Sequence, residues 1–199
     1  MAERKIVTVE LVFRGTVGLL MHNERLANPF DPITKEIATI TSKRNKKTEE
    51  DNLRIQRLEW EGGLYIAEGI GPYIPGANIK RCIMEAAALN KGMASVKRAL
   101  TPCEVEVPLI YTGPRTIQGL WDAETFIDVR SVKLSGRSKM LRARPRFNEW
   151  ALTTSMMLDV RLVSLDDFQL YVEQAGTTTG LGDYRPTFGR FMSQIVVKD

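Results

Sequence analysis

Alternating apolar and polar residues predict four main strands along the chain. Residues 6–14, Ile-Val-Thr-Val-Glu-Leu-Val-Phe-Arg, are β-branched and aromatic, which is typical of a strand. Similar patterns predict strands over residues 103–111, 150–158 and 194–197. Pro108 cannot donate to a strand ladder, so we expect the second strand to lie at a sheet edge or to contain a bulge.

Helical spacing and cap residues predict four helices. The first covers residues 33–42, with Asp31 near its start, and the second begins at Thr48 and ends at Gly62-Gly63. A third helix begins at residues 75–78, Pro-Gly-Ala-Asn, and continues with an apolar stripe. The fourth extends from Ser164 to Gly176.

The order of these elements suggests a known plan. Without a helical insertion and a basic hairpin, the order is close to βαβ–βαβ. The sequence therefore predicts an α+β fold with a ferredoxin-like, RRM-type core (βαββαβ). We expect one domain over 1–199, with the insertion at about 21–62 and a long basic β-hairpin at about 128–148.

Composition limits the class of protein. The chain has 199 residues and 43% hydrophobic content, which suits one domain, and it contains no apolar run that could span a membrane. Two cysteines and a single histidine argue against a zinc site, so we expect no metal and no cofactor. The two cysteines, which form no CxxC pair, and the absence of a signal-peptide pattern predict a cytoplasmic location, in the host cell if a phage encodes the protein.

The net charge of +4 is concentrated in one segment. Seven cations and no acid lie between Val129 and Asn148: Arg130, Lys133, Arg137, Lys139, Arg142, Arg144 and Arg146. These charges exceed the total, so the rest of the chain carries −3. In an extended arm, residues 142, 144 and 146 share one face, and an anion opposite them would relieve their repulsion. The alternative is a basic face that is merely solvated.

Two further stretches are candidates for binding a polyanion. Lys80 and Arg81 lie in the first turns of the third helix, where cations oppose the helix dipole unless an anion binds nearby. Solvated helix charges are the alternative. Residues 180–191 form a glycine-rich loop. Its arginines, Arg185 and Arg190, could pair with phosphates, and its aromatic rings, Tyr184 and Phe188, could stack on bases. Its glycines, Gly180, Gly182 and Gly189, could let a ligand backbone come close. A simple hairpin turn is the alternative there.

Two of these stretches together resemble the RAMP superfamily, the backbone subunits of CRISPR effector complexes. Residues 73–80, Tyr-Ile-Pro-Gly-Ala-Asn-Ile-Lys, resemble its "IPGSSLKG" helix start, and the glycine-rich loop resembles its C-terminal loop. Residues 13–20 are loosely similar to its early loop. The whole chain also resembles small proteins of tailed phages and prophages, which implies a phage type of protein.

The resemblance implies a ferredoxin-like core, a hairpin "thumb" and binding along single-stranded RNA by subunits stacked head to tail. By motif, Lys80 would meet a phosphate, and the loop glycines would let a backbone approach closely. Our leading hypothesis is a non-enzymatic binder of single-stranded RNA or DNA that self-associates along the strand. Its predicted contacts are Lys80, Arg81, Arg130, Lys133, Arg137, Lys139, Arg142, Arg144, Arg146, Gly180, Gly182, Tyr184, Arg185, Phe188 and Arg190.

Three alternatives stay open. Some RAMP proteins cut RNA with an acid after the first strand, which makes Asp31 a candidate for a metal-dependent endoribonuclease, although its position beside Pro32 favours a turn or a helix cap. His22 is a candidate general acid or base, or a histidine that only packs. The third alternative is a phage protein that mimics a CRISPR backbone subunit and binds a host protein complex.

Overall fold

The computed structural model describes residues 5–43, 47–133 and 139–198. The chain divides into two compact units, with two of the boundaries falling at β2 (Leu19–Leu20) and β3 (Ile66–Ala67). Unit 1 consists of Met1–Leu19, Ala67–Thr112 and Asn148–Asp199, and unit 2 of Leu20–Ile66 and Gly113–Phe147. Helices and antiparallel sheets together confirm the expected α+β class. The single domain over 1–199 stays a prediction.

Unit 1 is built on a sheet of four antiparallel strands. They are β1 (Ile6–Gly15), β5 (Leu100–Pro102), β9 (Ala151–Asp159) and β10 (Phe191–Lys198), in the order β10-β1-β9-β5. In β1, Leu11 lies between Thr154 of β9 and Ile195 of β10. In the middle of β1, Val9, Leu11 and Phe13 are buried because one face of the sheet carries the core.

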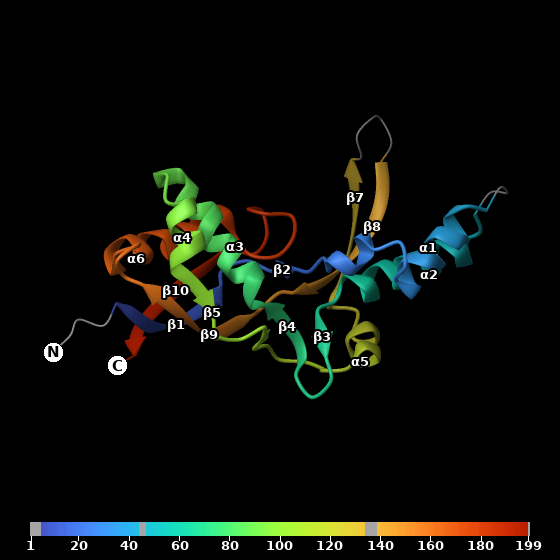
Figure 1. Ribbon diagram of the computed structural model, residues 1–199. Helices are drawn as coiled ribbons and strands as arrows, with labels where there is room; N and C mark the ends of the chain where they lie inside the picture. The colour runs from blue at the N-terminus through green and yellow to red at the C-terminus, as the bar shows by residue number, and fades with distance from the viewer. Residues whose placement is uncertain (1–4, 44–46, 134–138, 199) are drawn as a thin grey trace. The chain divides into compact units, whose positions relative to one another are not determined.

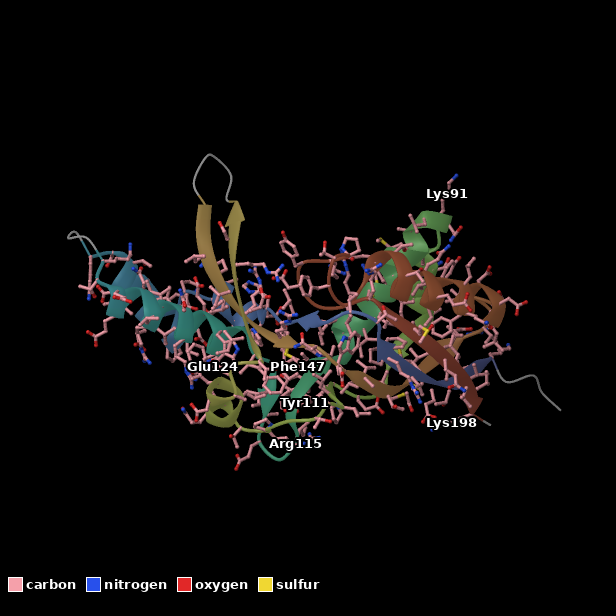
Figure 2. The ribbon with its side chains drawn as sticks, turned by 180° about the vertical axis from the view of Figure 1, so that it is seen from behind. Lys91, Tyr111, Arg115, Glu124, Phe147 and Lys198 are labelled. Carbon is pink, nitrogen blue, oxygen red and sulfur yellow. The ribbon has the colours of Figure 1, made fainter. Side chains whose placement is uncertain are left out.

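Three helices supply the other half of that core. α3 (Gly76–Ala87), α4 (Met93–Ala99) and α6 (Leu165–Gln174) lie on the same side of the sheet in Figure 1. The predicted stripe of α3 is buried at Ile79 and Ile83, and so is Phe168 of α6. Between α3 and α4, η2 (Ala88–Asn90) is capped by Lys91, whose φ is 60° and whose side chain points away from the helices (Figure 2).

The predicted strand over 103–111 is confirmed only in part. β6 (Glu106–Pro108) forms there and pairs with β4 (Gly71–Pro75) at the edge of a small sheet in the order β3-β4-β6, as expected from Pro108, and Ile110 makes an isolated bridge with Ala151 of β9. The Gly76 N–H, at the start of α3, donates to the Val105 carbonyl at 2.9 Å, which draws this segment toward the helix start. Pro102 and Pro108 cannot donate to a ladder, so the segment between them cannot extend the main sheet as one strand.

The helical part of unit 2 begins with η1 (Glu24–Ala27) and continues through α1 (Pro32–Thr41) and α2 (Glu49–Gly63). Asp31 caps α1 by accepting from the Ile33 N–H at 2.9 Å, and Thr48 forms a reciprocal capping box with Asp51 on α2. Both starts are where the sequence predicts them. A further short helix, α5 (Ile117–Asp122), is capped by Thr116 and was not among the predicted helices.

A β-hairpin forms the rest of unit 2. β7 (Ile127–Lys133) and β8 (Lys139–Phe147) pair antiparallel, and the sheet order is β2-β8-β7. α2 packs on the base of the hairpin, where the buried Trp60 donates from Nε1 to the Phe126 carbonyl at 2.9 Å. This contact fixes the helix against the strands. Within the described residues no helix combines the length and apolarity needed to cross a bilayer.

Candidate nucleic-acid interface

Four arginines occupy one face of the hairpin. Asp128 lies opposite Arg144, and Arg130 lies opposite Arg142, so these residues point to the same side of the β7–β8 ladder. Arg146 continues the same alternation, while the residues between the arginines of β8 are buried on the other face. We call Arg130, Arg142, Arg144 and Arg146 the arginine face. The side chains of Lys133 and Lys139, and all of Arg137, lie outside what the structure describes.

Asp128 neutralises part of the arginine face. Its carboxylate is 5% exposed and accepts two hydrogen bonds from Arg130, from Nε and from Nη2, each at 2.5 Å. Arg146 approaches the same carboxylate, with Nη1 3.7 Å from Oδ2. The predicted mutual repulsion along β8 is therefore relieved partly by a buried acid of the neighbouring strand β7, which lies just before the basic segment in sequence.

Glu59 neutralises a second position from a distant part of the sequence. It lies on α2, is 5% exposed and forms an ion pair with Arg142. Its Oε2 also accepts from the Ala143 N–H at 3.2 Å, which satisfies that backbone group. Four arginines against these two carboxylates leave a formal charge of +2 on the arginine face, less than the basic segment alone indicates.

His22 lies near this face and Asp31 has a structural role. His22 lines a cavity together with Glu59, Arg142 and Arg144. Asp31 caps α1 and pairs with Arg25 at 2.8 Å. Desolvation alone would raise the pKa of Asp31, but the hydrogen bonds from Arg25 and from the Ile33 N–H outweigh it and lower the pKa. No cluster of three or more His, Cys, Asp or Glu side chains placed to hold a metal occurs among the described residues.

In unit 1, Lys80 and Arg81 point to different partners. The Lys80 ammonium donates to the Lys97 carbonyl, in the last turn of α4, at 2.9 Å. A cation is favourable at that end of a helix, so this bond explains Lys80 without an anion. Arg81 pairs with Glu85 at 2.6 Å, and Glu85 also accepts from Arg185 of the glycine-rich loop at 2.9 Å. Two predicted phosphate contacts thus share one carboxylate that the sequence reasoning missed.

The glycines of the loop serve its own backbone. Gly180, Gly182 and Gly189 have φ values of 77°, 81° and 75°. A Cβ on Gly189 would lie 1.7 Å from the Leu181 carbonyl oxygen, and one on Gly180 would lie 2.8 Å from that of Phe188. The space beside these glycines, which we expected a ligand backbone to occupy, is therefore occupied by the backbone of the loop itself. The Cys82 thiol donates to the Gly180 carbonyl at 3.1 Å, and burial raises its pKa to about 12.

Beside this loop is a shallow hollow of about 550 Å³. Its lining includes Glu85, Asp183, Tyr184 and Arg185, so its charged side chains sum to −1. Tyr184 is 44% exposed and its ring packs edge-on against Phe188, with centroids 6.1 Å apart. Arg190 is exposed, and its carbonyl accepts from the Thr16 N–H. Because its charged side chains sum to −1, the hollow attracts phosphate less than the arginine face does.

The predicted contacts fall into two groups. Unit 1 holds Lys80, Arg81, Gly180, Gly182, Tyr184, Arg185, Phe188 and Arg190, and unit 2 holds the arginine face with Lys133 and Lys139. The acids that restrain them, Glu59, Glu85 and Asp128, were not predicted. Asp128 could have been found from its position two residues before Arg130, whereas Glu59 carried no local signal.

The fold of this chain resembles that of a chain in a solved assembly. A comparison with solved structures finds a chain of the type III-B Cmr-beta assembly bound to cognate target RNA, with a TM-score of 0.51 and 10% identity, covering 97% of this chain. Cmr6 from Pyrococcus furiosus matches with a TM-score of 0.41 and 10% identity, covering 96% of this chain and 100% of its own. No family model and no curated protein sequence matches the chain.

The Cmr-beta match shows a common fold and nothing more, because the identity is only 10%. The chain covers 61% of the length of that Cmr-beta chain. The match thus bears on the fold alone, and membership of the RAMP superfamily stays a prediction.

Proposed function

We propose that the protein binds single-stranded nucleic acid through the arginine face of the hairpin. The observation that carries this proposal is the placement of four arginines on one face with a formal charge of +2. A positive strip of this kind attracts a phosphate backbone whatever its sequence. The buried carboxylates of Asp128 and Glu59 favour binding in a second way, because they hold guanidinium groups in place before the strand arrives.

RNA is the first ligand to test. The Cmr-beta neighbour is bound to target RNA, and this chain has a related fold. The strand order β10-β1-β9-β5 places the fourth, first, third and second strands of a βαββαβ core side by side, which supports a ferredoxin-like core. We propose the same single-domain plan for the whole chain, with the hairpin and the helical insertion added to that core.

A protein partner is the second candidate. On the other face of the hairpin, Val129 and Leu141 are 46% and 54% exposed, which suits a contact with another protein surface. That partner is a further copy of the chain along a strand, as in a phage-type filament, or a host complex. Light scattering with and without a bound strand tests the first of these partners. A molar mass of several copies of the chain on the strand supports self-association, and a single copy favours a host complex.

Fluorescence anisotropy with labelled RNA, DNA of the same sequence and a duplex tests the main proposal. The variant Arg144→Gln/Arg146→Gln removes two charges while Asp128 keeps Arg130 and Glu59 keeps Arg142. We expect it to weaken binding to single strands by about tenfold or more. Arg54→Gln, which removes an exposed arginine of α2, is the matched control and keeps wild-type affinity. Equal affinities for the double variant and the wild type would remove the arginine face from the site.

A further inference from the structure

Unit 2 contains a cavity of about 530 Å³ beside the arginine face. Its lining comes from η1, α1, α2, β8 and the segment after β2. The volume lies within the roughly 300–1,000 Å³ of small-molecule sites. Binding of an extended strand along the hairpin does not by itself require a cavity of this kind.

The lining combines apolar and polar side chains. Leu26 and Ala27 of η1 and Ile37 of α1 supply an aliphatic part, which suits the flat face of a base. Thr34 and His22 add hydrogen-bonding groups. A ligand that fills this cavity has an apolar body and a polar end.

The charge of the cavity favours an anion. Glu59 is held by Arg142 and by the Ala143 N–H, so its negative charge is already balanced. Arg142 and Arg144 against Glu59 leave a formal charge of +1. The ion pair also fixes the Arg142 guanidinium at the cavity, which makes Glu59 a positioning residue for it.

We propose that this cavity binds a nucleoside phosphomonoester, either a free mononucleotide or the phosphorylated end of a strand. A phosphomonoester carries about −1.5 to −2 charges at neutral pH, more than the single charge of a diester inside a strand. The arginines take the phosphate, and the aliphatic residues cover the base. The strand-end form rests on the proposed function, whereas the free mononucleotide form stands without it.

Calorimetric titration with AMP and UMP tests the site directly. We expect both to bind, and adenosine or inorganic phosphate alone to bind at least tenfold more weakly, because each satisfies half of the cavity. Arg144→Met and Ala27→Trp should each weaken AMP binding at least tenfold. The first removes a charge, and the second fills the cavity from an exposed position of η1 where folding is little affected. Arg54→Met is the control for Arg144→Met.

Competition with strands identifies the source of the ligand. Displacement of labelled AMP by an oligonucleotide with a terminal phosphate, but not by its dephosphorylated form, supports the strand end. Displacement by mononucleotides alone supports the free ligand. Absence of AMP binding in protein that still binds long strands overturns the cavity proposal and leaves the proposed function standing. AMP binding that Arg144→Met and Ala27→Trp leave unchanged also overturns it.

Discussion

The carboxylate of Glu85 accepts a hydrogen bond from the Arg185 guanidinium at 2.9 Å and joins α3 to the glycine-rich loop across 100 residues of sequence. The same carboxylate holds Arg81 at 2.6 Å. Arg81 and Arg185, which the sequence predicts to contact phosphate, therefore share Glu85 as a partner within the protein. The same arrangement recurs in unit 2, where Asp128 and Glu59 hold arginines of the hairpin.

The Glu85 ion pairs should make stability depend on pH. Burial alone would raise the pKa of Glu85, but the hydrogen bond from Arg81 and the charge of Arg185 outweigh it and lower the pKa below its usual 4.5. A lowered folded-state pKa stabilises the fold above the unfolded value and loses this effect as the pH falls through the folded value. The melting temperature of Glu85→Gln should thus lie below that of the wild type near neutral pH, with the gap closing below about pH 4.5.

The control for this pH series is Glu173→Gln. Glu173 is an exposed helix carboxylate whose hydrogen bond comes from the neutral Gln169. Its substitution should leave the melting temperature near that of the wild type throughout. A gap between Glu85→Gln and the wild type that stays constant down to pH 3 would contradict the ion-pair account.

Gly189 should be far less tolerant of substitution than Gly69. Both have φ near 75°, but a Cβ on Gly189 meets the Leu181 backbone, whereas one on Gly69 has nothing within 4 Å. Gly69→Ala should cost about 1 kcal/mol of unfolding free energy from backbone strain alone. Gly189→Ala should cost at least about 2 kcal/mol because the loop must also open. Denaturant titrations of the two variants make the comparison, and equal costs would show that the loop is not closed on itself.

The two thiols should differ in reactivity. Cys82 is buried, and burial raises its pKa to about 12, so almost no thiolate forms near neutral pH. Cys103 is exposed, although burial of part of the thiol and the charge of Glu104 raise its pKa as well. A thiol reagent at pH 8 should label Cys103 in the native protein and Cys82 only after unfolding. Rapid labelling of native Cys103→Ser would contradict the burial of Cys82.

Asp31 should matter for stability and not for catalysis. Asp31→Ala removes the cap of α1 and the ion pair with Arg25, and should cost about 1 kcal/mol of unfolding free energy. Asp31→Ser, which restores a cap without the charge, should recover much of that loss. Labelled RNA incubated with the wild type and Mg²⁺ or Mn²⁺ should stay intact. Cleavage by the wild type that Asp31→Ala abolishes would instead support the ribonuclease alternative.

Helices and strands could be predicted where neighbouring residues determine them. The site could not be predicted fully, because its ion pairs join residues that are far apart in the sequence. The start of α3, the Thr48 capping box and the alternation of β8 depend on neighbouring residues, so they could be predicted from the sequence. The pair Glu59–Arg142 joins residues 83 positions apart, and nothing near Glu59 marks it as buried. Lys80 was assigned to an anion because it lies in the first turns of α3. Its bond to the Lys97 carbonyl could not be predicted, since that bond depends on how α3 packs on α4.

The dependence of affinity on salt tests the arginine face most directly. For single strands, the slope of log affinity against log salt changes by roughly 0.7 for each phosphate contact. The variant Arg144→Gln/Arg146→Gln should therefore bind RNA with a slope shallower by about 1.4 than the wild type, for strands of any sequence. The same slope in both proteins, or no binding of single strands by the wild type at low salt, would contradict the account.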